Sequence, residues 1–190
     1  PEIPDSSKGF TVTFDFEISD GKGTDADAGH GPAGEIPGEG FSFNYGNFKH
    51  GELGNGEEGY NKNGKSDWKT NTENLSFEFD TRECCSGDDG GVSISTFHNG
   101  KDMKNHAHNS GALLEDGSTK IGKASIRWDP DNGATFITTG LTTNADFKNV
   151  DTGDFKGDDA FIFGFSARVA GARQDVFIDN LIITTGKPVI

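Results

Sequence analysis

The stretch "FTVTFDFEIS", Phe10–Ser19, alternates apolar and polar side chains over its whole length. Alternation with a period of two is typical of a β-strand with one buried and one exposed face. The apolar set, which we predict to be buried, is Phe10, Val12, Phe14, Phe16 and Ile18. The stretch therefore predicts a half-buried antiparallel strand, because antiparallel sheets commonly place one face on the core and the other in water.

The same alternation recurs along the rest of the chain, in residues 40–46, 75–81, 91–97, 123–128, 134–140, 160–169 and 175–184. Asn132-Gly133 separates two of these stretches and is a strong hairpin signal. No segment shows the periodicity and caps of a helix. The pattern predicts an all-β fold, a two-sheet antiparallel sandwich or jelly roll with long loops rich in Gly, Asp and Asn.

The composition is that of one folded domain. The chain has 190 residues, and its 16 phenylalanines offset a hydrophobic content of only 31%. The alternating stretches predict a single domain over residues 10–185. Residues 1–9 are interpreted as a linker or mature N-terminus, and residues 186–190 as a C-terminal tail or linker.

The charge and the cysteines restrict the partners. Seventeen bases against 31 acids give a net charge of −14, which repels nucleic acid and anionic lipid. No apolar run approaches the roughly 20 residues that span a bilayer, so membrane insertion is not expected. Cys84 and Cys85 are adjacent and cannot join distant segments. A vicinal disulfide, a bridge to another chain and two free thiols all remain open.

Three stretches, in this order, resemble the concanavalin A-like lectin/glucanase superfamily, especially its L-type lectins and LamG-like jelly rolls. They are "EGFSFNYG" (residues 39–46), "LSFEFDT" (75–81) with its acidic loop and "GVSIS" (91–95), and "FIFGFSARVAGARQDVFIDNLIITT" (161–185). The resemblance covers most of residues 10–185. It implies two packed antiparallel sheets.

The resemblance also implies a metal site. Glu78 and Asp80 fall on the carboxylates that hold a transition metal and a calcium in L-type lectins. Alternate residues of a strand share a face, so both can reach one site. Calcium needs six to eight oxygens, and we expect Asp88 and Asp89 of the following loop to supply more of them. We therefore expect Ca²⁺ as the cofactor.

The chain departs from the lectin pattern at three positions. Cys84 and Gly91 stand where the family has an asparagine and a histidine ligand, and Glu39 replaces its sugar-binding aspartate. Asparagine, glycine and an aromatic ring are suitable contacts for the hydroxyls and the apolar face of a sugar. The residues expected to bind a neutral glycan are Glu39, Gly40, Asn44, Asp80, Arg168 and Arg173.

A catalytic interpretation rests on the same strand. Glu78-x-Asp80-x-x-Glu83 resembles the signature of retaining β-glucanases in the superfamily, with Glu78 as nucleophile and Glu83 as acid/base. That chemistry requires two carboxyl groups about 5–5.5 Å apart on one face. A bulge would have to turn Glu83 toward Glu78, because strict alternation points them to opposite faces.

Two further groups of residues are candidates for metal binding. Glu17 and Asp179, on strands expected to be neighbours, would share a structural calcium, or would simply be exposed strand acids. His98, His106 and His108 lie in a segment (98–111) that we interpret as a polar surface loop. In that interpretation the histidines are not metal ligands.

These patterns together favour a non-catalytic, extracellular carbohydrate-binding or adhesion module, secreted or displayed at a surface, whose partner is a neutral glycan or glycoprotein. The first alternative is a structural subunit of a fibre, sheath or large adhesin that self-associates or belongs to a larger protein. The second is a β-glucanase-like hydrolase.

Overall fold

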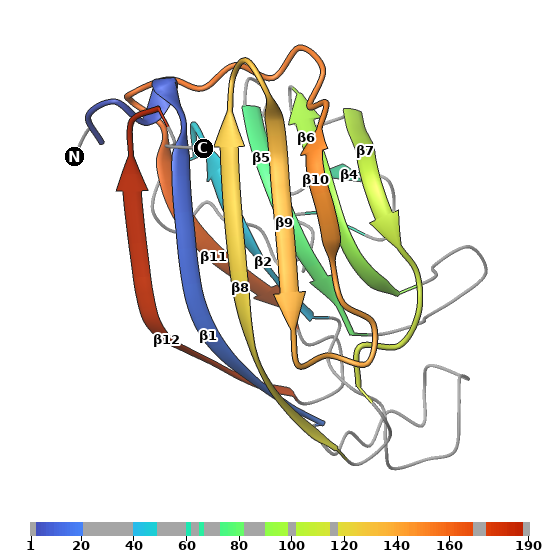
Figure 1. Ribbon diagram of the computed structural model, residues 1–190. Helices are drawn as coiled ribbons and strands as arrows, with labels where there is room; N and C mark the ends of the chain where they lie inside the picture. Colours follow the sequence, from blue (N-terminus) through green and yellow to red (C-terminus); the bar gives the residue numbers. More distant parts are fainter. Residues whose placement is uncertain are drawn as a thin grey trace.

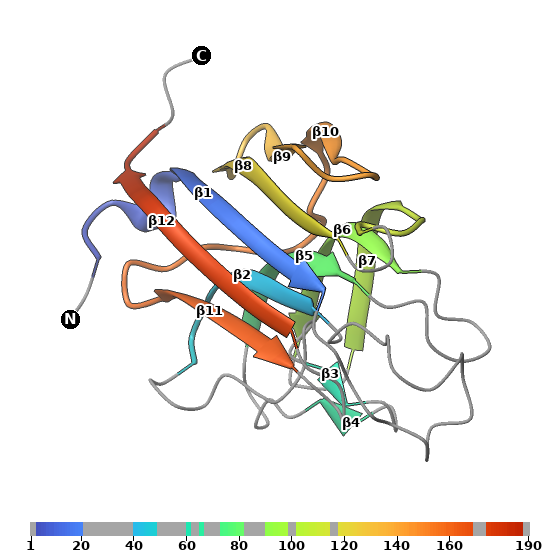
Figure 2. The same ribbon diagram turned by 90° about the horizontal axis from the view of Figure 1, so that it is seen from below.

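A computed structural model describes residues 3–20, 40–48, 60–61, 65–66, 73–81, 90–98, 102–114, 118–168 and 174–187. These residues form β-strands and one short 3₁₀ turn, Ser6–Lys8, with no α-helix among them. The strands make two antiparallel five-stranded sheets that pack face to face as two layers (Figures 1 and 2). The predicted all-β sandwich is confirmed.

The first layer, which we name sheet A, has the order β10-β9-β8-β1-β12. Its strands are β1 (Phe10–Asp20), β8 (Thr119–Asp129), β9 (Gly133–Thr139), β10 (Asp146–Val150) and β12 (Gln174–Thr185). The second layer, sheet B, has the order β11-β2-β5-β6-β7. Its strands are β2 (Gly40–Gly46), β5 (Glu73–Asp80), β6 (Gly91–His98), β7 (Asp102–Asn109) and β11 (Ile162–Arg168). Two short strands, β3 (Tyr60–Asn61) and β4 (Lys65–Ser66), pair with each other.

The core between the sheets is aromatic. The five apolar residues predicted from β1 are each at most 2% exposed, and one buried cluster joins them to both sheets. Phe41 and Phe79 stack with ring centroids 4.2 Å apart, and Trp128 is completely buried against Phe10, Tyr45 and Phe155. Each buried aromatic side chain contributes roughly 1.5–3 kcal/mol. Phenylalanine therefore compensates for the low overall hydrophobicity.

The hairpin predicted at Asn132-Gly133 joins β8 to β9. Gly133 has φ +78°, a conformation that favours glycine. The Asp129 carboxylate accepts hydrogen bonds from the Asp131 N–H and the Asn132 side chain. These contacts fix the turn. Burial raises the pKa of Asp129, but the hydrogen bonds from Asn132 and Asp131 together outweigh it, so the pKa is lowered.

The structure contradicts the interpretation of residues 98–111 as a polar surface loop. Residues 102–109 form β7, which pairs with β6 as the edge strand of sheet B. An edge strand has a neighbour on one side only and tolerates a polar sequence, which is why its alternation is weak. Strand β10, residues 146–150, is a second edge strand that the sequence pattern did not predict.

The described part of the N-terminal segment packs against the domain. Ile3 donates its N–H to the Asp159 carbonyl, and Ser6 is fully buried. The Tyr45 hydroxyl lies 2.9 Å from the Asp158 carbonyl oxygen and 3.1 Å from Ser6 Oγ. Burial raises the pKa of Tyr45 to about 12. Residues 3–9 are thus held to the loop before β11.

Candidate functional site

Four strand ends meet at one end of sheet B. In the pairing of β11, β2, β5 and β6, Arg168 lies opposite Gly40, Gly40 opposite Asp80, and Asp80 opposite Gly91. Strands β5 and β11 end there, and β2 and β6 begin there. The structure therefore brings the backbones of three predicted glycan-binding residues, Gly40, Asp80 and Arg168, into one row, which we name the end row.

The two glycines of the end row are required by their backbone conformation and by their surroundings. Gly40 and Gly91 have φ +118° and +117°, where side chains are strained. A Cβ on Gly40 would lie 2.0 Å from the Phe79 carbonyl oxygen, and one on Gly91 would lie 2.2 Å from the Asn109 carbonyl oxygen. Only glycine lets the strands approach this closely.

The outer face of sheet B, the face away from the core, carries mostly polar side chains. Strand pairing aligns Ser166, Ser42, Glu78, Ser93 and His108 across all five strands, next to the end row. Most polar side chains of this face are at most 6% exposed: Ser42, Asn44, Asn74, Ser76, Glu78, Ser93, Ser95 and Ser166. We name these eight residues the polar layer.

Hydrogen bonds connect much of the polar layer. Ser42 Oγ and Ser166 Oγ lie 2.7 Å apart, and the Asn44 amide donates to Ser42 Oγ at 2.9 Å. The Asn74 amide donates in turn to Asn44 Oδ1 at 2.9 Å. Asn44, a predicted glycan contact, is fully buried and lies two rows from Gly40. Its role in the structure is to join three strands.

Glu78 lies inside the polar layer with its carboxylate held by serine hydroxyls. Glu78 Oε2 accepts hydrogen bonds from Ser93 Oγ and, at 3.2 Å, from Ser95 Oγ. The residue is 3% exposed. Asp80, the next residue on this face, is half-buried at the end row. The two carboxylates of the strand therefore have different environments, one enclosed and one at the edge.

Some buried polar atoms of the layer lack a hydrogen-bond partner among the described residues. Ser76 Oγ and Asn74 Oδ1, on the same face of β5, are examples. An unmatched buried polar group costs roughly 1–3 kcal/mol. Asn74 also begins an Asn-Leu-Ser glycosylation sequon, but it is fully buried in the fold.

Several predicted site residues lie outside the described residues, so their positions stay predictions. They are Glu39, Glu83, Asp88, Asp89, Arg173 and the cysteines Cys84 and Cys85. For Arg168 the backbone is described and the side chain is not.

Glu17 and Asp179, which we expected to share a calcium, do not lie opposite each other in the strand pairing. Strands β1 and β12 are neighbours as expected, but Glu17 lies opposite Phe177, and Asp179 lies opposite Asp15. Asp15 accepts hydrogen bonds from Lys123 Nζ at 2.9 Å and from the Asn180 amide at 2.8 Å. These two bonds lower the pKa of Asp15. A calcium shared by Glu17 and Asp179 stays a prediction.

The histidines of β7 make separate contacts. His106 Nε2 lies 2.7 Å from Thr96 Oγ1, and His108 Nε2 lies 2.8 Å from the Gly90 carbonyl oxygen. Among the described residues, no group of three or more His, Cys, Asp and Glu side chains is placed to hold a metal ion.

The described part of the chain contains no helix with the length and hydrophobicity required to span a bilayer.

Sequence reasoning missed the serines of the polar layer. The alternation of their strands places Ser42, Ser93 and Ser166 on the face of the sheet opposite the phenylalanines. Alternation alone predicts a solvent-exposed face at these positions. It does not reveal that this face is buried or that its hydroxyls surround Glu78.

Comparison with known proteins gives structural matches only. No protein family and no curated protein matches the sequence. The structure resembles the Emp46p carbohydrate recognition domain in its potassium-bound form, with TM-score 0.51 and 13% identity over 100% of this chain and 76% of that chain. A weaker similarity, with TM-score 0.38 and 13% identity over 94% of this chain and 70% of that chain, is to an alginate lyase Aly36B mutant in complex with an alginate trisaccharide. The chain therefore has the concanavalin A-like β-sandwich fold.

Proposed function

We propose that this chain is a non-catalytic carbohydrate-binding module that binds a neutral glycan at the end row of sheet B. The observation that supports the proposal best is the alignment of Gly40, Asp80 and Arg168 in one row. These residues come from three predicted glycan-binding segments that are far apart in the chain. The Emp46p domain, whose fold is similar, is a carbohydrate recognition domain.

The two carboxylates of β5 have separate roles in this proposal. Asp80, half-buried at the end row, accepts hydrogen bonds from sugar hydroxyls. Glu78 is enclosed, and its serine contacts hold β5 against β6 behind the binding edge. A nucleophile must reach the anomeric carbon of its substrate. The enclosure of Glu78 therefore supports binding over glycoside hydrolysis.

Calcium would organise this edge rather than perform chemistry. We propose that Asp80 binds the ion together with Asp88 and Asp89 of the loop that follows β5. Carboxylate oxygens are the ligands that calcium prefers, and the net charge of −14 favours cation binding. Glu78 is 3% exposed and its Oε2 accepts hydrogen bonds from Ser93 and Ser95, so we assign the ion to the more exposed Asp80 and its loop.

Binding of neutral oligosaccharides, measured by glycan array and then by calorimetry, tests the proposal. The matched variants are Asp80→Asn at the end row and Asp146→Asn, an exposed acid of sheet A. A charged hydrogen bond contributes about 1.5–3 kcal/mol, so Asp80→Asn should weaken binding by about tenfold or more. Asp146→Asn should bind like the wild type. Equal binding by wild type and Asp80→Asn would refute the site.

Two further measurements separate the other functions. EDTA should abolish glycan binding, and metal analysis of the purified chain should find calcium. Reducing sugar released from a β-glucan, and lost in Glu78→Gln, would instead establish a hydrolase. The extracellular location that we propose is tested by localising the protein in its source cells.

A further inference from the structure

Strand β12 is the outer strand of sheet A, and no described strand pairs with its free side (Figures 1 and 2). Every second residue of such an edge strand points its N–H and C=O away from the sheet, where they can pair with another strand. Residues 179–184 of β12 are all exposed. This part of the edge is therefore accessible to a further strand.

The other edge strands of the two sheets are protected from pairing by charge, irregularity or burial. Strand β10 has only five residues, a register irregularity and the charged Asp146 and Lys148. Strand β7 carries Asp102, Lys104 and two histidines. In β11, residues 162–166 are buried or half-buried. Short length, irregular pairing and charge all oppose the addition of a strand.

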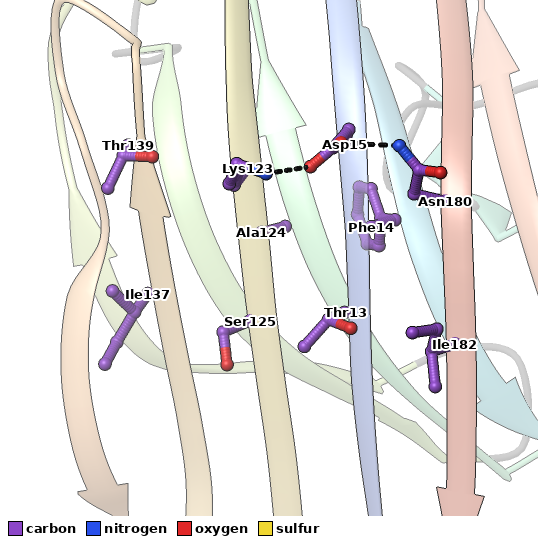
Figure 3. Close-up of a pocket in the computed structure, with 10 residues that line it drawn as sticks. All are labelled: Thr13, Phe14, Asp15, Lys123, Ala124, Ser125, Ile137, Thr139, Asn180 and Ile182. Atoms are coloured by element: carbon purple, nitrogen blue, oxygen red, sulfur yellow. Dashed lines mark hydrogen bonds and ion pairs between the residues drawn. The ribbon is translucent and has the colours of Figure 1, made fainter.

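The first part of β12 is protected in the same way, and its last part is not. Asp175 and Asp179 carry charge, and the pairing with β1 is irregular next to Asp15. Asn180, within this irregularity, has φ +52°, and its amide donates to Asp15 at 2.8 Å (Figure 3). Residues 181–185 complete the strand without a charged side chain or a proline. We name these five residues the edge run.

The edge run is apolar on both faces. Ile182 lies opposite Thr13 on the outer face, as Figure 3 shows, and is 62% exposed. Ile183 lies opposite the buried Val12 and so faces the core, as does Leu181 two residues before it. Leu181 and Ile183 are nevertheless 45% and 36% exposed. Core-facing side chains are thus left partly uncovered at this edge.

We infer that the edge run pairs with the edge run of a second copy of the chain. The strands are antiparallel, and the two-fold axis is perpendicular to sheet A and passes between the two Ile182 residues. Ile182 then lies opposite Ile182 of the second copy, and Leu181 lies opposite its Ile183, twice. Apolar side chains meet on both faces, and sheet A continues from one copy into the other. Both copies use the same surface, as a two-fold interface requires.

Other registers match the side chains less well. A shift by one residue places core-facing side chains opposite outward-facing ones, because the faces of a strand alternate. With Leu181 opposite itself, the pairing would bring the charged Asp179 to Ile183. With Ile183 opposite itself, Leu181 would lie opposite Thr185, whose hydroxyl donates to the Pro4 carbonyl oxygen at 2.8 Å. The register centred on Ile182 is the one that places apolar residues opposite each other throughout.

The charges of the chain do not oppose this contact. The whole chain carries −14, but the edge run carries no charge. Asp179, the acid nearest to the edge run along the chain, lies three residues from Ile182. The Asp179 residues of the two copies would therefore lie six residues, about 20 Å, apart along the strands. This separation exceeds the screening length of about 8–10 Å at ordinary salt. Main-chain hydrogen bonds and apolar contacts therefore determine the affinity.

Sedimentation equilibrium of the full chain, up to high concentration because a single strand pair is a small interface, tests the inference. The wild type should form a dimer and nothing larger. Ile182→Lys places two like charges opposite each other and should raise the dimer dissociation constant by about tenfold or more. Ile121→Lys is the matched control, because Ile121 is 70% exposed on the outer face of β8, two strands from β12. It should dimerise like the wild type.

A mixing experiment tests the register itself. Because residue 182 lies opposite itself, Ile182→Lys and Ile182→Glu should each be mostly monomeric alone and should form a heterodimer when mixed in equal amounts. Urea unfolding of each variant verifies that the fold is intact, as expected for a change on the exposed outer face. A wild type that stays monomeric or forms larger assemblies, a dimer that Ile182→Lys leaves unchanged, or a mixture that fails to associate would each overturn the inference.

Discussion

Gly40→Ala should destabilise this protein much more than an alanine at another glycine of similar backbone conformation. Gly40 has φ +118°, and an added Cβ would lie 2.0 Å from the Phe79 carbonyl oxygen and 3.0 Å from its carbon. Gly186 has φ +102°, but a Cβ there meets nothing within 4 Å. The two sites share backbone strain and differ in the collision with a neighbouring strand.

The magnitudes follow from these two terms. Placing a side chain at positive φ costs roughly 1–2 kcal/mol, which is the whole expected cost of Gly186→Ala. At Gly40 the backbone of β5 must also move away, which weakens the pairing of Gly40 with Asp80. Each disrupted backbone hydrogen bond adds about 1 kcal/mol. Gly40→Ala should therefore cost about 3–4 kcal/mol, a large share of a typical total of 5–15 kcal/mol.

Urea unfolding followed by fluorescence and circular dichroism measures both free energies. The same variant should also lose glycan binding, because the end row is displaced. If Gly40→Ala and Gly186→Ala had equal free energies of unfolding, the collision with Phe79 would have no energetic cost and the predicted difference would be wrong. If Gly40→Ala bound glycan as tightly as the wild type, that result would count against a glycan site at the end row.

Three other changes test the core and the polar layer. Tyr45→Phe should lower stability by about 1 kcal/mol, because it removes the hydroxyl contacts with Asp158 and Ser6 while the ring stays packed. The pKa of Tyr45 is raised from 10.0 to about 12, so the folded state retains a proton that the unfolded state loses, and wild-type stability should fall as pH rises from 10 to 12. The phenylalanine variant should lack this part of the pH dependence, as urea unfolding at pH 9 and 11.5 would show; identical pH profiles would contradict it. Glu78→Leu should cost about 2–4 kcal/mol in the same assay, whereas Glu78→Gln, whose amide oxygen still accepts hydrogen bonds from the serines, should cost less than half as much; equal losses would count against a hydrogen-bonding role. Phe79→Ala should cost about 3–5 kcal/mol because the ring packs against four others, and a loss under 1 kcal/mol would contradict that packing.

Local residue patterns were sufficient to predict the fold class and the inward faces of most strands. Period-two alternation is a local property, and it identified all five core residues of β1 and the hairpin at Asn132-Gly133. It failed at β7 and β10, residues 102–109 and 146–150, which are edge strands. Edge strands need no continuous apolar face, so their sequences carry a weaker signal.

Which side chains lie next to one another became known from the folded arrangement of the strands. The pairing of β1 with β12 shifts between Thr13 and Asp15, and it sets Asp179 opposite Asp15 instead of Glu17. The end row likewise depends on the pairing of strands that are distant in sequence, which brings Gly40, Asp80 and Arg168 together. Glu78 is buried although the alternation of its strand predicts an exposed position, and this burial also depends on the folded arrangement of the chain. Register, sheet order and burial depend on contacts between distant segments, so no local pattern of residues contains them.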